Sequence, residues 1–142
     1  MLKVAKFGGT SLADSEQFKK VYAIVKNNDE RKYVVVSAPG KRFKDDNKIT
    51  DLLYLAYAHI KYSVPYDPVL RIIEDRFKLI KNELNLNIDL DYEFKTIREA
   101  LNNKCDEDYI VSRGEYLCAL LMADYQECDR SEERRVGKEC RS

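Results

Sequence analysis

The sequence predicts an α/β fold built on a parallel sheet, of which this chain supplies only the beginning. Two observations carry that prediction. A short apolar segment at residues 2–7 ends at the pair Gly8-Gly9 and is followed by a helical pattern. The uninterrupted run at residues 33–36, Tyr-Val-Val-Val, is typical of a strand buried on both faces. Strand, glycine turn, helix and strand form a βαβ unit, whose two strands we expect to be parallel.

Helical spacing predicts most of the remaining elements. Asp14 is a suitable N-cap with Gln17 in the capping-box position, and this first helix should end at Asn27. After a polar surface loop at 39–47, Thr50-Asp51 is expected to cap the next helix. Three apolar faces then follow, with Leu52, Leu55, Ala56 and Ile60; with Val69, Ile73, Phe77, Ile80 and Leu84; and with Leu90, Phe94, Ile97 and Leu101.

A last helix is expected from about Ser112, after an extended or loop segment at 109–111. Two strands among four or five helices are too few for a finished α/β domain, because sheets usually contain more strands and must be covered on both faces. The 142 residues have room for one domain. We therefore expect an incomplete fold.

Composition narrows the classes of function. The charged residues balance to a formal net charge of zero, which gives no reason to expect nucleic acid as a partner. No apolar run approaches the roughly 20 residues of a membrane span, and no secretion signal is evident, so a cytoplasmic location is expected. The four cysteines lack the spacing of a zinc or redox motif, so we expect no metal site, and Cys118 should be a small buried residue.

The segment 127–142 differs from the rest of the chain. Ten of its sixteen residues are charged, and Arg outnumbers Lys four to one, whereas Lys outnumbers Arg fourteen to six before residue 127. We therefore divide the chain into a folded portion, 1–126, and a charged tail, 127–142. The composition of the tail fits disorder, and its abrupt change in basic residues favours a non-native origin.

Chemistry is concentrated in the first turn. The amides of Gly8 and Gly9 can converge on an anion, because glycines permit backbone conformations closed to other residues. Lys6 adds a positive charge, and Thr10 and Ser11 add hydroxyl donors. The spacing is neither that of a Walker A loop nor that of a dinucleotide fingerprint. Taken alone, these residues fit a phosphate site and a plain tight turn with a solvated lysine equally well.

Four motifs occur in order along the chain: Lys6-Phe7-Gly8-Gly9-Thr10-Ser11, Val34-Val35-Val36-Ser37-Ala38, Thr50-Asp51-Leu52-Leu53 and Ser112-Arg113-Gly114-Glu115-Tyr116-Leu117. Together they resemble the aspartate kinases, a family with the amino-acid kinase fold. The resemblance covers residues 2–125. It implies a three-layer fold, with a parallel-rich sheet between helices, of which this chain is the N-terminal portion. It also implies transfer of the ATP γ-phosphoryl to the side-chain carboxylate of L-aspartate, the first step of lysine, threonine and methionine biosynthesis.

The resemblance also implies roles for individual residues. Lys6 would neutralise the transferred phosphoryl as the catalytic residue, and Phe7, Gly8 and Gly9 would complete the nucleotide-phosphate site. Ser37, Thr50 and Glu115 would bind L-aspartate, with Glu115 pairing with its ammonium group. ATP would carry Mg²⁺, and the full-length protein would form a homo-oligomer. The family's adenine pocket lies beyond this segment, so the chain alone is expected to be inactive.

Three alternatives remain open from the sequence. The first is another amino-acid kinase with glutamate, N-acetylglutamate or a nucleotide as acceptor. The second is a non-catalytic module that binds phosphate or a nucleotide, and the third is a structural or interaction fragment without a ligand. If the chain binds no ligand, Thr50 would cap a helix and Glu115 would interact with a helix dipole.

Overall fold

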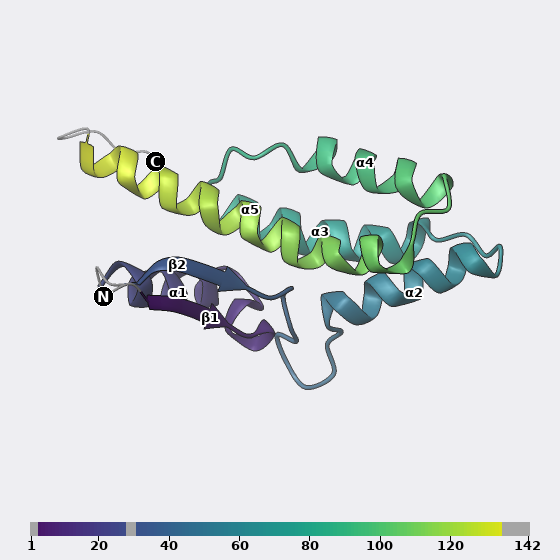
Figure 1. Cartoon of the computed structure of the whole chain (residues 1–142), viewed down its shortest axis with the longest axis horizontal. Coiled ribbons are helices and arrows are strands. Elements are labelled where there is room, and N and C mark those ends of the chain that lie inside the picture. The colour runs from purple at the N-terminus through teal and green to yellow at the C-terminus, as the bar shows by residue number, and fades with distance from the viewer. Residues whose placement is uncertain (1–2, 28–30, 135–142) are drawn as a thin grey trace.

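A two-stranded parallel sheet lies at one end of a group of helices (Figure 1). The computed structural model describes residues 3–27 and 31–134, with the backbone alone for residues 31–33 and 129–134. The elements in chain order are β1 (Lys3–Phe7), the 3-10 helix η1 (Gly9–Leu12), α1 (Ser15–Lys26), β2 (Arg31–Val36), α2 (Ile49–Lys61), α3 (Asp67–Glu83), α4 (Leu90–Asn102) and α5 (Glu107–Arg134).

The two strands confirm the predicted βαβ unit. They pair in parallel, with Val4 opposite Tyr33 and Phe7 opposite Val36. Helix α1 connects them and contacts β2, and α5 contacts β2 as well. Val36 and the following Ala38 are buried, and Phe7 packs against the same core.

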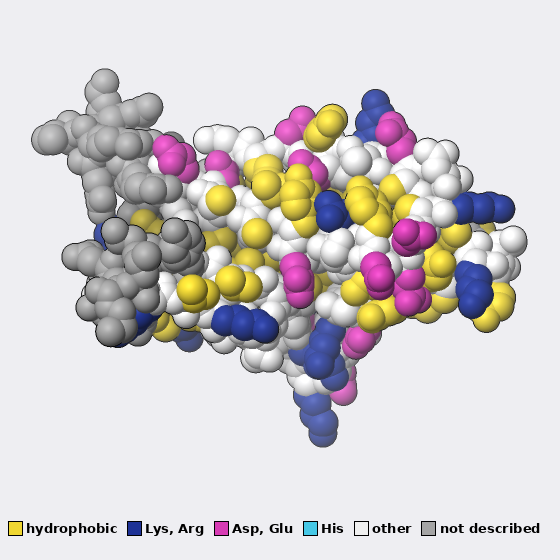
Figure 2. Space-filling view, in the orientation of Figure 1, with side chains coloured by type: hydrophobic (Ala, Val, Ile, Leu, Met, Phe, Trp, Pro, Cys, Tyr) yellow, Lys and Arg dark blue, Asp and Glu magenta, His cyan; other side chains and the backbone are white. Residues whose placement is uncertain are grey.

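The prediction that the second strand is buried on both faces is wrong. Val35 is 48% exposed, and Val4 on the neighbouring strand is 68% exposed. Within the described residues, this face of the sheet has no covering layer, so hydrophobic side chains remain visible over the strands (Figure 2). The β-branched run correctly predicts a strand, but the burial of its second face needs structure that residues 3–27 and 31–134 do not supply.

Side-chain caps fix two helices where the sequence predicts them to begin. The Gln17 N–H donates to Asp14 Oδ1 at 3.0 Å before α1, and the Tyr92 N–H donates to Asp89 Oδ1 at 3.0 Å before α4. Each cap satisfies a helix amide that has no partner inside the helix. Helix α1 ends at Lys26, with Asn27 as the C-cap, as predicted.

Two predicted helix starts are wrong. Helix α2 begins at Ile49 after Lys48, which makes no side-chain cap, so Thr50 lies inside the first turn instead of capping it. Helix α5 begins at Glu107, so residues 109–111 and the whole motif from Ser112 are helical. The acidic Glu107 and Asp108 in the first turn favour this earlier start, because they complement the positive end of the helix dipole.

Helix α5 also crosses the boundary predicted at residue 127. It continues to Arg134, and Cys128 is buried. The predicted tail therefore begins as helix, while residues 135–142 lie outside the described part of the chain. The non-native origin of this segment stays a prediction.

The core lies between the helices. Helix α5 contacts α2, α3 and α4, and its Leu117, Cys118 and Leu121 are almost completely buried. Cys118 is completely buried, which confirms the prediction, and this burial raises the pKa of its thiol to about 12. No helix in the described ranges combines the length and the apolarity needed to cross a bilayer.

Candidate functional site

A pocket of about 370 Å³ opens beyond the carboxyl ends of both strands. This is the edge at which open α/β sheets bind their ligands. The lining residues come from the segments after β1 and β2, the start of α2, and α5: Gly9, Thr10, Ser37, Ala38, Pro39, Gly40, Lys48, Thr50, Asp51 and Glu115. The pocket brings together Gly9, Ser37, Thr50 and Glu115, four of the residues predicted for a site from the sequence.

Backbone hydrogen bonds join the segments that line the pocket. The Ser37 N–H donates to the Phe7 carbonyl at 3.2 Å and so extends the parallel ladder by one residue. The Gly40 N–H donates to the Gly9 carbonyl at 2.8 Å, and the Ile49 N–H donates to the Pro39 carbonyl at 3.1 Å. The turn after β1, the loop after β2 and the start of α2 therefore form one connected wall.

Close approach of the backbone, and not a left-handed conformation, requires glycine at Gly9 and Gly40 but not at Gly8. Gly8 has an extended φ of −80°, and a Cβ there would meet nothing within 4 Å. A Cβ on Gly9 would lie 3.0 Å from the Ala38 carbonyl oxygen, and one on Gly40 would lie 2.7 Å from the Gly9 carbonyl carbon. The expectation that Gly8-Gly9 adopts conformations closed to other residues is therefore wrong.

Three of the site residues predicted in the first motif do not line the pocket. Lys6 is exposed and pairs in register with Val35, on the open face of the sheet. Phe7 packs against the core, and Gly8 is exposed at the end of the strand. Lys6 is nevertheless only three residues before the pocket-lining Gly9, at the same end of β1.

Gly114 brings helix α5 and Glu115 to the pocket. A Cβ at this position would lie 2.8 Å from Ala38 Cβ and 3.2 Å from both Ile49 Cγ2 and Leu53 Cδ1. The absence of a side chain thus lets α5 touch the end of β2 and the first turns of α2. Glu115, the next residue, consequently reaches the lining.

Gly114→Ala is expected to destabilise the chain despite the better helix propensity of alanine. That propensity is worth about 1 kcal/mol, whereas overpacking costs about 1–3 kcal/mol, and Ala38 Cβ cannot rotate away from the added methyl group. Urea unfolding followed by circular dichroism measures the loss. Ala119→Gly on the exposed face of α5 is the matched control, since it changes propensity without adding a contact. An increase in stability for Gly114→Ala would contradict the close packing.

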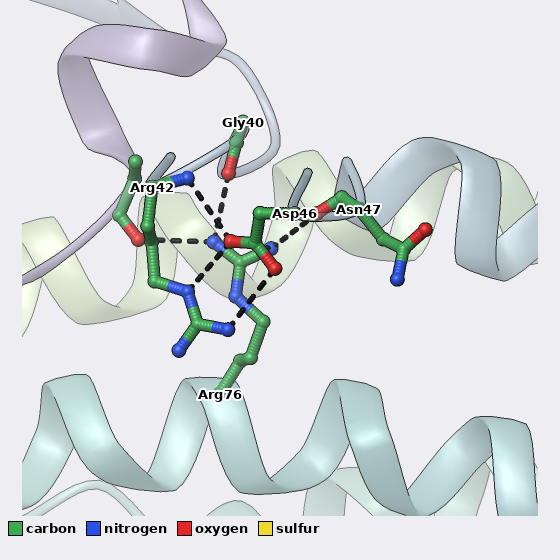
Figure 3. Close-up of polar contacts among 6 residues, drawn as sticks. Gly40, Arg42, Asp46, Asn47 and Arg76 are labelled. Carbon is green, nitrogen blue, oxygen red and sulfur yellow. Dashed lines mark hydrogen bonds and ion pairs between the residues drawn. The ribbon is translucent and has the colours of Figure 1, made fainter. Parts of the chain in front are cut away.

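A buried arginine lies behind the wall of the pocket (Figure 3). Arg76 projects from α3 with only 5% of its side chain exposed. Its guanidinium donates to the carbonyl oxygens of Asn47 (2.7 Å), Gly40 (2.8 Å) and Ala13 (3.0 Å). We did not predict this buried residue from the sequence, although the sequence indicates it: Arg76 is the one charged residue within the apolar stripe of Ile73, Phe77 and Ile80.

Asp46 completes this cluster. Its Oδ2 lies 4.0 Å from Arg76 Nη1. Arg42 grips the same carboxylate through Nε (2.6 Å), Nη2 (3.1 Å) and its backbone N–H (3.0 Å). The hydrogen bonds from the Arg42 side chain are the main reason why the pKa of Asp46 lies well below its usual range, and the charge of Arg76 adds to the effect. The predicted surface loop is exposed at Lys41–Asp45 but anchored at both ends.

The lowered pKa of Asp46 predicts a loss of stability in acid. A carboxyl whose pKa is lower in the folded chain binds its proton more readily when unfolded, so its contribution is present above pH of about 4 and is lost as the pH falls below that. We expect Asp46→Asn to flatten the decline in the free energy of unfolding between about pH 4 and pH 2. Asp45→Asn, an exposed neighbour, is the control. Equal slopes for the two variants, measured by urea titration, would contradict the assignment.

The chain belongs to the amino acid kinase family, whose model matches residues 1–127. Within that family it is similar to aspartokinases. It is 44% identical over 85 residues to Aspartokinase 3 of Bacillus subtilis, an alignment that covers 60% of this chain and 19% of the relative.

Solved structures agree with this relationship. Aspartate kinase from Clostridium acetobutylicum superposes with a TM-score of 0.85 at 47% identity, over 88% of this chain and 29% of that chain. Aspartokinase III of E. coli, in complex with aspartate and ADP, superposes with a TM-score of 0.70 at 23% identity, over 92% of this chain and 30% of that chain. The second likeness shows the fold alone. This chain thus spans less than a third of the length of the aspartokinases that it matches.

Proposed function

We propose that the pocket is the acceptor site of an aspartate kinase, the enzyme that transfers the γ-phosphoryl of ATP to the side-chain carboxylate of L-aspartate. The observation that carries the proposal is the meeting of Gly9, Ser37, Thr50 and Glu115 in one pocket. These residues come from four separate segments of the sequence. The similarity to aspartokinases supports the same acceptor.

The lining offers charges of both signs and hydroxyl groups, as an amino acid with an ammonium and carboxylates requires. Lys48 contributes a positive charge, Asp51 and Glu115 contribute negative charges, and Ser37 and Thr50 contribute hydroxyl groups. In our proposal Glu115 pairs with the ammonium of L-aspartate, while the hydroxyl groups of Ser37 and Thr50 donate hydrogen bonds to carboxylate oxygens of L-aspartate. Since Thr50 is not the N-cap of α2, its hydroxyl is not committed to that structural role.

The reaction requires no general base on the acceptor. An aspartate carboxyl with an ordinary pKa near 3.9 is already ionised at neutral pH. Phosphoryl transfer then depends on positioning and on stabilisation of charge. We assign the stabilisation of phosphoryl charge to Lys6 and to the amides of Gly8 and Gly9, at the carboxyl end of β1. Mg²⁺ would enter on the nucleotide, since this ion is commonly held by substrate phosphates together with one or two carboxylates.

Calorimetry with the 142-residue chain tests the acceptor. We expect L-aspartate to bind, and N-acetyl-L-aspartate, which lacks the ammonium, to bind at least about tenfold more weakly. Glu115→Gln should lower the affinity for L-aspartate by a similar factor, whereas Glu107→Gln on the same helix should leave this affinity unchanged. Equal affinity for the two compounds, or an unchanged affinity in Glu115→Gln, would rule out the proposed contact. Stronger binding of L-glutamate or N-acetyl-L-glutamate would point to another acceptor.

The same method separates a kinase portion from a nucleotide-binding module. If the rest of the kinase domain supplies the adenine contacts, as the family resemblance implies, ATP with Mg²⁺ should bind weakly to this chain. Tight binding of ATP, unaffected by L-aspartate, would favour the non-catalytic module.

A further inference from the structure

We propose that Arg76 is a positioning residue of the pocket, which holds three segments of the pocket wall in register from behind. The proposal rests on the proposed function only for the choice of ligand. Arg76 does not line the pocket and lies on α3, an element that contributes nothing to the lining. Its role is therefore to set the positions of residues that do touch the ligand.

Each carbonyl oxygen that Arg76 binds belongs to a different segment of the pocket wall. Ala13 directly follows η1, which contains Gly9 and Thr10. Gly40 is the last residue of the pocket-lining run that begins at Ser37, in the first part of the loop after β2. Asn47 directly precedes Lys48, the first pocket residue before α2. One guanidinium thus contacts all three of the segments that meet at this end of the sheet.

Each backbone hydrogen bond joins only two segments of the pocket wall, whereas Arg76 contacts all three of these segments. Gly40 joins Gly9, and Ile49 joins Pro39, as described above. In the folded chain the turn after β1 and the start of α2 meet on the Arg76 guanidinium, through Ala13 and Asn47. A change at Arg76 should consequently alter the spacing between those two segments, and with it the distance from Gly9 to Thr50.

Only arginine fits this position. A guanidinium offers five N–H donors in a rigid plane, so it can serve three carbonyl oxygens at once, whereas a lysine ammonium is a compact point charge without that fork. The site is also shielded from water, with Arg76 and Asp46 side chains only 5% and 7% exposed. Carbonyl oxygens left without a donor there would not be fully compensated by solvent.

Arg42 and Asp46 close the cluster toward solvent. The Arg42 side chain is 32% exposed and holds both carboxylate oxygens of Asp46. Asp46 in turn is the carboxylate nearest to Arg76 among the ion pairs of the described residues. Asp46 therefore lies next to both the partly exposed Arg42 and the buried Arg76 (Figure 3).

Amide hydrogen exchange, measured by NMR on the 142-residue chain, tests the positioning role without a ligand. In Arg76→Lys we expect the amides of Gly40 and Ile49 to exchange about tenfold faster, because the loops that they join lose their common anchor. The matched control is Arg98→Lys, on α4, whose side chain pairs with Asp67 and Glu74 away from the pocket. Exchange at Gly40 and Ile49 that is no faster in Arg76→Lys than in Arg98→Lys would overturn the proposal.

Ligand affinity is the second readout, and a merely structural arginine would not change it. Under conditions where both variants are fully folded, Arg76→Lys should lower the affinity for L-aspartate by about tenfold, and Arg98→Lys should lower it by less than about twofold. Equal affinity in the two variants would overturn the positioning role. A wild-type chain that does not bind L-aspartate would instead overturn the proposed acceptor, while the exchange measurement would still decide the role of Arg76.

A third variant covers the case in which Arg76→Lys does not fold. Arg42→Ala removes the two side-chain hydrogen bonds that hold the Asp46 carboxylate beside Arg76, so the Arg76 guanidinium loses its fixed counter-charge and should hold the three carbonyl oxygens less firmly. Faster exchange confined to the Gly40 and Ile49 amides would support the proposal. Unchanged exchange, or a uniform increase across α3, α4 and α5, would contradict it.

Discussion

Replacing Gly40 with alanine is expected to separate the loop after β2 from the turn after β1. The added Cβ would lie 2.7 Å from the Gly9 carbonyl carbon, 2.8 Å from Thr10 N and 3.0 Å from the Gly9 carbonyl oxygen. All three are backbone atoms, so no side chain can rotate to make room. We expect a loss near the upper end of the range of about 1–3 kcal/mol for overpacking, together with loss of L-aspartate binding.

Gly8→Ala is the control for this prediction. The same methyl group there meets nothing within 4 Å, and the extended φ of −80° suits alanine. Its free energy of unfolding should stay within about 0.5 kcal/mol of wild type. Urea unfolding gives both values. If Gly40→Ala is as stable as Gly8→Ala, the loops do not approach as closely as the structure indicates.

Arg76→Met is expected to have the largest effect on stability in the chain. Methionine keeps a flexible stem of similar length but leaves three carbonyl oxygens and the Asp46 carboxylate without their buried donor. Loss of one partner from a buried charged pair costs about 3–5 kcal/mol. Since small domains are stable by only about 5–15 kcal/mol, this loss is a large fraction of the total stability.

The comparison for Arg76→Met is Arg98→Met. Arg98 also pairs with two carboxylates, at 2.9 Å and 3.2 Å, but its side chain is 30% exposed. Partly exposed pairs contribute roughly 0–1 kcal/mol each, so this variant should lose far less. Chemical unfolding monitored by fluorescence of the tyrosines measures the difference. Equal losses would mean that burial of Arg76 does not govern its contribution.

Local patterns in the sequence predicted most of the elements, for physical reasons. The apolar stripes of α3 and α4 follow the helical period, and Asp14 caps its helix as expected. The parallel pairing follows from the βαβ order. Four of the predicted site residues meet in the pocket because they lie at the carboxyl ends of strands or in helices packed against those ends.

The errors arose where tertiary contacts decide. The last helix begins at Glu107 and not near Ser112, and Gly114 lies inside it, where the missing side chain is needed for packing against Ala38 and Ile49. Gly9 likewise serves a close approach to Gly40, which is distant in sequence. Arg76 donates hydrogen bonds to carbonyl oxygens in three segments that are distant from it in sequence, and no local pattern predicts such partners.

Mapping of L-aspartate by two-dimensional ¹⁵N NMR on the 142-residue chain tests the central claim most directly. If the pocket is the acceptor site, the amides of Gly9, Ser37, Thr50 and Glu115 should shift together and saturate with one dissociation constant. Amides on the far side of α4 should not move. An absence of shifts at saturating L-aspartate, or shifts confined to another surface, would contradict the assignment of this pocket.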